Sequence, residues 1–502
     1  MPSTFNVAGG PRFEADSPPL ALRRPVFSFV CAWLWLGGAV GCLLAAGCGG
    51  ARRFDDPIAA MTDPRLTVGE HRAAMEQARL DHPDEPRRLE QLKEIISGPA
   101  HSVESRAAAW HHLEERDPED AKAVLEYRLP THAAWGFVQW ACELIAERGW
   151  VEMTPSLVRS LYRPSPGFTE ELRPERVALM RLHENRDIRE IVFDVVADPP
   201  RNVVHAQWRL SAWELLNRLG ESDLWQDRLA ALNSDDPMLS DLRLGYVELA
   251  VIARTREEVL RLQHLRRAEH LATWERCRDI AAALGAEQKR GLRLRHLPVL
   301  ERVCELHPDW LEQSPAALLA SLDARFVGKL HFHPEAIMSS RSLNTGPQSL
   351  REWGETLSWA DLLTVRLAEH MTFDPVMIHQ LLPQAQRDRE DTSTEYGGII
   401  DYAQGQPRAT LYPPIHRSHD LKYYAPASMV EAGYLAPFHY HFHAQEVRNT
   451  EYAGPGGGDI EYANTMAVNA IVFTSVGEGR LNADFYTEGR IVIDLGTIEG
   501  PK

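Results

Sequence analysis

Cysteine and positive charge are both scarce in this chain of 502 residues. Only three of its six cysteines, Cys142, Cys277 and Cys304, lie beyond residue 50, and their wide spacing forms neither a disulfide framework nor a C-x-x-C metal knuckle. We expect these three to be small core residues. Lysine and arginine number 54 against 71 aspartates and glutamates, a net charge of −17, so phosphate backbones are repelled at long range. The charge balance therefore argues against a nucleic-acid partner.

Several sequence motifs of common enzymes are also missing. The chain has no Gly-rich phosphate loop, no G-x-S-x-G elbow and no Cys-His pattern for a nucleophile. The composition also differs from that of a disordered protein, because 44% of the residues are hydrophobic and glycine and proline number only 33 each. At about 150 residues per domain, the length predicts about three folded domains.

The N-terminus carries an export pattern. Arg23 and Arg24 precede an uncharged, apolar run over residues 25–51, which is typical of a signal peptide. The run includes Leu44-Ala45-Ala46-Gly47-Cys48, which resembles the lipobox of bacterial lipoproteins. The resemblance implies that residues 1–47 are a signal segment, that Cys48 is lipidated, and that the exported chain is tethered to a membrane. An uncleaved transmembrane anchor and a cleaved, unlipidated leader remain open, and both also place the mature chain outside the cytoplasm.

A polar linker over residues 48–63 leads into a long helical region at 64–330. Apolar residues from Trp208 to Leu219 recur at helical spacing, and Gly220 follows as a stop signal. The same spacing predicts helices at Ala133–Arg148, Arg186–Ala197, Leu242–Ala253, Glu257–Ala268, Leu271–Leu284 and Leu292–Leu306. This train of helices resembles a HEAT-type solenoid, with an irregular bundle as the alternative. Either would offer a surface to a protein partner.

After a connecting segment at 331–373, the sequence pattern changes from mainly helical to a mixture of helices and strands. Residues 374–502 predict an α+β domain, so the whole chain is expected to be a multidomain α+β protein. Helices are predicted at Trp359–Met371 and Val376–Arg389. Strands rich in β-branched and aromatic residues, separated by glycine turns, are predicted at Ala470–Ser475, Arg480–Tyr486 and Arg490–Leu495.

One cluster of residues in this domain contains side chains that can bind a metal ion. His439, His441 and His443 alternate with aromatic residues, and in a strand this alternation places all three imidazoles on one face. Asp459 follows sixteen residues beyond His443, after the glycine-rich stretch 453–458. Two imidazoles, a carboxylate and an open fourth position describe a catalytic zinc site.

The order of these elements is similar to that of the JAB/MPN metalloproteases with the JAMM motif. The matching elements are Glu395 with Gly397 and Gly398, Tyr440-His441-Phe442-His443, and Pro455-Gly456-Gly457-Gly458-Asp459. The resemblance implies a cytidine-deaminase-like α+β fold at 374–502 in which His441, His443 and Asp459 hold Zn²⁺. It implies that Glu395 is the general base of a hydrolase acting on peptide or isopeptide bonds. The chain would then be a membrane-tethered zinc hydrolase with a peptide or protein substrate.

Alternatives remain for the ligands and for the activity. His439 competes for the metal, but the family has an aromatic residue before its first histidine, as Tyr440 stands before His441. Ala444 stands where the family has proline, and Gly456 where it has the serine that donates to the oxyanion. Loss of one such donor costs about 10²–10³ in turnover unless an amide of Gly456, Gly457 or Gly458 substitutes. A second hypothesis is therefore an inactive JAB-like binding module on a helical scaffold lipoprotein, and a third is a metal-binding or sensing lipoprotein.

A second H-x-H pair precedes the C-terminal domain. His331-Phe332-His333-Pro334 fits the family string more closely than the preferred pair does. No Glu-Gly-Gly strand lies nearby upstream, and no aspartate follows at the required offset. We interpret it as the edge of a linker.

Overall fold

A computed structural model gives the fold of the chain. It describes residues 53–131, 134–165, 169–198, 203–220, 223–332, 348–418 and 422–500. The chain divides into two units, Met1–Arg53 and Phe54–Lys502, and the helices and strands below belong to the second. The predicted signal segment 1–47 and the lipidation site Cys48 lie outside the described residues. Within the described ranges, no helix has the length and apolar character needed to span a membrane.

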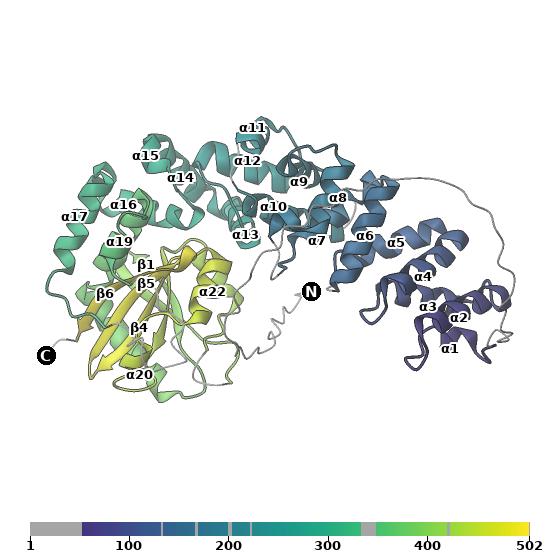
Figure 1. The fold of residues 1–502 in the computed structure, drawn as a ribbon. Coiled ribbons are helices and arrows are strands. Elements are labelled where there is room, and N and C mark those ends of the chain that lie inside the picture. The colour runs from purple at the N-terminus through teal and green to yellow at the C-terminus, as the bar shows by residue number, and fades with distance from the viewer. Residues whose placement is uncertain are drawn as a thin grey trace, which may run out of the picture. The chain divides into compact units, whose positions relative to one another are not determined.

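The N-terminal part of the second unit is helical (Figure 1). Its first helices are α1 (Pro57–Ala60), α2 (Val68–Asp81), α3 (Pro86–Ser97), α4 (Val103–Arg116), α5 (Pro118–Arg128), α6 (Trp135–Arg148), α7 (Thr154–Tyr162), α8 (Pro174–Leu182) and α9 (Ile188–Ala197). They are followed by α10 (Val203–Arg218), α11 (Asp223–Ala231), α12 (Pro237–Leu249), α13 (Arg256–Leu265), α14 (Leu271–Ala283), α15 (Ala286–Lys289), α16 (Leu297–Leu306) and α17 (Pro315–Phe326). The predicted helices are thus present, and the HEAT-type arrangement remains a prediction.

Proline begins several of these helices rather than separating them. In α12, Asp236 is the N-cap and accepts a hydrogen bond from the amide of Leu239, while Pro237 occupies the first turn. The helix therefore starts five residues before the predicted Leu242, because proline at the first position needs no amide partner. In the same way α16 starts at Leu297, and Pro298 lies in its first turn.

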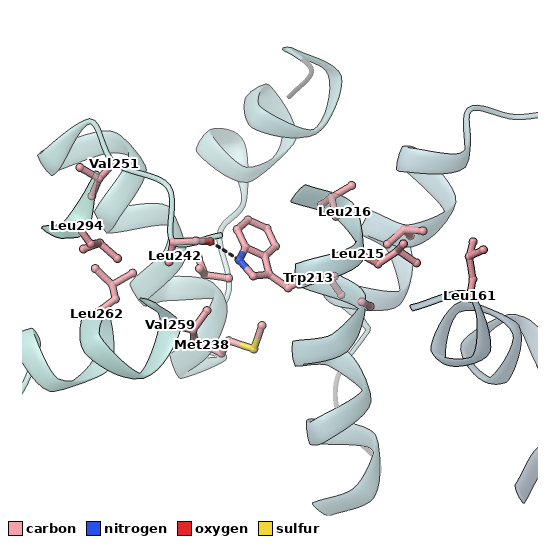
Figure 2. Close-up of a cluster of buried hydrophobic side chains, with 14 of the residues drawn as sticks. Leu161, Trp213, Leu215, Leu216, Met238, Leu242, Val251, Val259, Leu262 and Leu294 are labelled. Atoms are coloured by element: carbon pink, nitrogen blue, oxygen red, sulfur yellow. Dashed lines mark hydrogen bonds between the residues drawn. The ribbon is translucent and has the colours of Figure 1, made fainter. Parts of the chain in front are cut away.

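A tryptophan packs at the centre of the helical part. Trp213 of α10 is fully buried among leucines and other apolar side chains of α7, α12 and α13 (Figure 2). Its indole N–H donates to the carbonyl oxygen of Ala253, so the polar edge of the ring is satisfied inside the core. Cys142 and Cys277 are buried as predicted. Cys304 is exposed, which corrects its predicted core position, because it lines a surface hollow with the charged Glu301 and Arg302.

The C-terminal part contains one mixed six-stranded sheet. Four helices accompany it: α18 (Leu350–Trp353), α19 (Trp359–Thr372), α20 (Pro375–Glu390) and α21 (Ala427–Gly433), with α22 (Gly457–Met466) between strands. The strands are β1 (Gly397–Ala403), β2 (Gln406–Tyr412), β3 (Phe438–His443), β4 (Ala470–Gly477), β5 (Arg480–Thr487) and β6 (Ile491–Glu499). Their order is β2-β1-β3-β4-β5-β6, and β3 pairs parallel with β4 while the other neighbours are antiparallel. The chain is therefore α+β, with helices first and a mixed sheet last.

The two faces of the sheet have different neighbours. Phe438, Tyr440 and Phe442 of β3 belong to the main hydrophobic core, which also contains residues of α19 and α20. The alternate residues of β3 are the histidines, and their partners on β4 include Val472. Val472 packs with Ile460 of α22, so α22 covers the histidine face (Figure 1).

Candidate metal centre

Three elements bring the predicted site residues together. His441 and His443 lie at the end of β3, in the middle of the sheet. Glu395 precedes β1, and Gly397 of that strand pairs with His441. Asp459 is the third residue of α22, which covers the same face. The predicted glutamate, histidines and aspartate therefore converge from two strands and one helix.

The two histidines face each other through their Nε2 atoms. Nε2 of His441 lies 3.3 Å from Nε2 of His443, with the rings nearly perpendicular at 76°. Two nitrogens bound to tetrahedral zinc at about 2.0–2.1 Å are about 3.3 Å apart. The spacing of this pair equals the separation of two ligands on one zinc ion.

Asp459 adds a carboxylate to the pair. Its Oδ1 lies 3.2 Å from Nε2 of His441, and its Oδ2 lies 3.6 Å from Nε2 of His443. Oδ2 also accepts a hydrogen bond of 2.7 Å from the amide of Gly456, which fixes the carboxylate at the start of α22. Burial opposes ionisation, but the attraction and hydrogen bonds of the two histidines outweigh it and hold the pKa of Asp459 well below its usual range.

Outer contacts orient both imidazoles. Nδ1 of His443 lies 3.0 Å from the carbonyl oxygen of Tyr452, which can only accept, so Nδ1 carries the proton of the neutral ring and Nε2 offers a lone pair. Nδ1 of His441 lies 3.4 Å from the hydroxyl of Tyr486. Burial alone lowers the pKa of His443, but Asp459 and then Glu395 raise it to about 9.

Glu395 is buried beside this pair. Its carboxylate and one nitrogen each of His441 and His443 lie within 4.8 Å of one another. Nε2 of Gln445 donates to Glu395 Oε1 over 3.2 Å, and Gln445 accepts in turn from Asn449 over 2.7 Å. Glu395, His441 and His443 are therefore a group that could hold a metal ion, and Asp459 contacts both imidazoles as well.

His439, the alternative ligand, lies apart from this group. Its Nδ1 is 2.8 Å from the hydroxyl of Tyr462, and its Nε2 lies against Gly433, where an added Cβ would stand 2.2 Å away. Burial lowers the pKa of His439 to about 4. His439 is therefore a neutral packing residue between β3, α21 and α22.

The three glycines before Asp459 form the start of α22. Gly456 is the N-cap, with φ −78°, and Gly457 begins the helix. An added Cβ at Gly456 would make an ordinary contact of 3.5 Å to Asp459, and at Gly458 it would meet nothing within 4 Å. The left-handed residue of this turn is Gly454, with φ +85°. Backbone conformation therefore does not require glycine at position 456.

Sequence reasoning missed Asp388, in the last turn of α20. The fully buried Asp388 accepts hydrogen bonds from the amide of Tyr396 over 2.6 Å and from the amide of Ala444 over 3.3 Å. Burial, with a smaller contribution from Glu395, raises the pKa of Asp388 to about 8. The signal was an acidic residue at a helix C-terminus, where the helix dipole disfavours negative charge.

The second H-x-H pair has a structural partner. His331 forms an ion pair of 3.2 Å with the buried Asp494 of β6, and its pKa is raised by the hydrogen bond to that carboxylate. His333 lies outside the described residues.

Comparison of the chain with protein-family models found no match, and comparisons with curated proteins and with solved structures found no significant match. The assignment of the centre therefore depends on its geometry and on its order of elements.

Proposed function

We propose that residues 374–502 form a JAB/MPN-like, zinc-dependent hydrolase of the JAMM type that cleaves peptide or isopeptide bonds. One observation carries the proposal. Nε2 of His441 and Nε2 of His443 are 3.3 Å apart, with Asp459 oxygens at 3.2 and 3.6 Å and the Glu395 carboxylate beside them.

The donor set fits zinc. Two imidazole nitrogens and one carboxylate leave a fourth position open, as catalytic rather than structural zinc sites do. His441, His443 and Asp459 would hold the ion. When bound, Zn²⁺ supplies Lewis acidity that lowers the pKa of water and polarises a carbonyl oxygen.

The protein's own groups supply the remaining chemistry. The Glu395 carboxylate is placed to take a proton from the attacking water and to return it to the leaving amine. Gln445 and Asn449 form a hydrogen-bonded chain that orients this carboxylate. The first amides of α22 have no partners within the helix, and they are available to the developing oxyanion in place of the serine that Gly456 replaces.

The test combines metal content with turnover. We expect the full-length chain to bind one zinc ion and to hydrolyse members of a panel of fluorogenic peptides and ε-linked lysine isopeptides. Glu395→Gln is expected to keep zinc and lose turnover, and His443→Ala to lose the metal. His439→Ala is the matched control, because it removes a histidine of the same strand face while leaving zinc in place. A wild type without zinc would rule out the proposal.

Gly456 favours a second candidate, an inactive binding module on a helical scaffold. The local packing leaves room for a serine side chain at position 456, so the structure does not require glycine there. Stoichiometric zinc in a wild type that cleaves nothing in the panel would select this candidate. The membrane tether through Cys48 and a protein partner for the helical region belong to both candidates.

A further inference from the structure

The last turn of α20 contacts the two strand ends that carry the site. Tyr396 follows Glu395 directly, and Ala444 follows His443 directly. Asp388 accepts from both of these amides, over 2.6 and 3.3 Å, with one carboxylate oxygen for each. A single side chain thus joins the residue after the proposed base to the residue after a proposed ligand.

The neighbouring residue, Arg389, contacts the other backbone polar group of Ala444. Nε of Arg389 donates to the carbonyl oxygen of Ala444 over 3.3 Å, and its Nη2 donates to Oγ of Ser475 over 3.0 Å. Both polar groups of Ala444 therefore bond to α20. A proline at position 444 would have no amide proton to give Asp388.

The contact spans a place where strand pairing ends. The pairing of β1 with β3 runs from Ile400 to Gly397, and one further hydrogen bond joins the amide of Phe442 to the carbonyl of Tyr396 over 3.1 Å. Beyond this point, Glu395 and His443 leave the β1–β3 ladder. Asp388 bridges these two ends where the ladder stops.

We propose that Asp388 is a positioning residue that sets the distance between Glu395 and His443. The proposal builds on the function proposed above. Asp388 acts through the backbone of Tyr396 and Ala444, and it fixes where the base lies relative to the metal. Because outer-shell partners hold ligands in their productive geometry, removing this one weakens metal binding without removing a ligand.

The variant Asp388→Asn tests this role in the full-length chain. The side-chain oxygen of asparagine can accept a hydrogen bond from one of the two backbone N–H groups, while its NH₂ group repels the other. We expect zinc affinity, measured by competition with a chromophoric chelator, to fall about 10–100-fold. The visible absorption bands of the Co²⁺-loaded protein should shift or lose intensity, because they depend on ligand geometry.

Asp391→Asn is the matched control. Asp391 lies three residues later, at the end of the same helix, and accepts from the hydroxyls of Ser393 and Tyr396. We expect this variant to keep the wild-type zinc affinity and Co²⁺ spectrum. Equal behaviour of Asp388→Asn and Asp391→Asn would overturn the proposal and leave the zinc-hydrolase function untouched.

A readout without metal separates the two proposals. If the wild type binds no zinc, the proposed function fails, but hydrogen exchange still reports on Asp388. The amides of Tyr396 and Ala444 should then exchange about tenfold faster in Asp388→Asn. If Asp388→Asn does not fold, Asp388→Thr serves instead. The threonine hydroxyl oxygen can accept one hydrogen bond, and the side chain has no NH₂ group to repel the backbone amides. Unchanged exchange, or failure of both variants to fold, would overturn the positioning role.

Discussion

Arg261 of α13 donates from its Nε to the carbonyl oxygen of Tyr434, 2.9 Å away, just after the end of α21. The side chain is buried, and its Nη1 lies 3.5 Å from the carbonyl oxygen of Ala467, after the end of α22. One arginine of the helical part thus satisfies helix ends on both elements that flank His439. This polar contact joins the helical part to two helices that accompany the sheet.

Arg261→Met is therefore expected to destabilise the whole second unit. Two buried carbonyls would lose a charged donor, which costs about 2–4 kcal/mol of unfolding free energy. Urea unfolding of the full-length chain measures the change. Arg278→Met, at a half-exposed position on α14, should change stability by less than about 0.5 kcal/mol. Equal stabilities for the two variants would contradict this prediction.

Zinc affinity should rise with pH. The pKa of His443 is raised from 6.5 to about 9, so metal must displace a proton from this ring below that pH. We expect the apparent affinity to increase about tenfold per pH unit between pH 6.5 and 9 and to level off above. Chelator competition at four pH values measures the slope. An affinity that stays flat over this window would show that His443 is neutral in the metal-free protein.

The metal-free protein should show the opposite trend in stability. A histidine whose pKa is raised on folding stabilises the folded state fully below pH 6.5. That contribution is lost as the pH rises through about 9. Thermal unfolding in the presence of a chelator, from pH 6.5 to 9.5, should give a falling Tm for the wild type and a weaker pH dependence for His443→Ala.

Gly456→Ser should be accepted by the fold and should raise turnover. Its backbone has φ −78°, and an added Cβ meets only Asp459, at an ordinary 3.5 Å. Serine is a good N-cap, so stability should change by a few tenths of a kcal/mol in favour of the variant. A hydroxyl donor at the oxyanion is expected to raise kcat about tenfold or more. Gly136→Ser in α6, where the added Cβ meets nothing within 4 Å, is the control and should leave kcat unchanged.

Gly433→Ala should be strongly destabilising. An added Cβ would stand 2.2 Å from Nε2 of the buried His439, which cannot move away from Tyr462 without leaving its hydrogen bond. Overpacking of this kind costs about 1–3 kcal/mol. Gly136→Ala in α6, where the added Cβ meets nothing within 4 Å, should instead be neutral or stabilising by up to about 1 kcal/mol. Chemical denaturation compares the two variants.

The sequence predicted those parts of the fold that depend on local periodicity. Alternation in β3 indicated that His441 and His443 share a face, and the H-bonded ladder with β4 agrees. Helix starts were less accurate, because the helix predicted at Leu242–Ala253 begins five residues earlier, at Pro237. The hairpin strand β2 and helix α21 were not predicted, since neither carries a distinctive apolar pattern.

Long-range partners could not be predicted from one sequence. Asp388 lies 56 positions from Ala444, and Arg261 lies 173 from Tyr434, so no local pattern connects them. The rejection of His439 also needed coordinates, because alternation places it on the same face as its two neighbours. Only the packing of Tyr462 and Gly433 around the ring separates His439 from the proposed ligands.

Because β3 and β4 run side by side in the same direction, the polypeptide between them has to return across one face before it can re-enter the sheet. That return path includes α22, whose third residue, Asp459, lies 3.2 Å from Nε2 of His441. Within that path, Arg448 bridges to Val476, and the amide of Asn449 donates to the carbonyl oxygen of Ser475 over 2.7 Å, so the segment ahead of α22 is tied to β4. The parallel pairing of β3 and β4 thus makes the approach of the Asp459 carboxylate to the two imidazoles a consequence of the chain's crossover rather than of the loop alone.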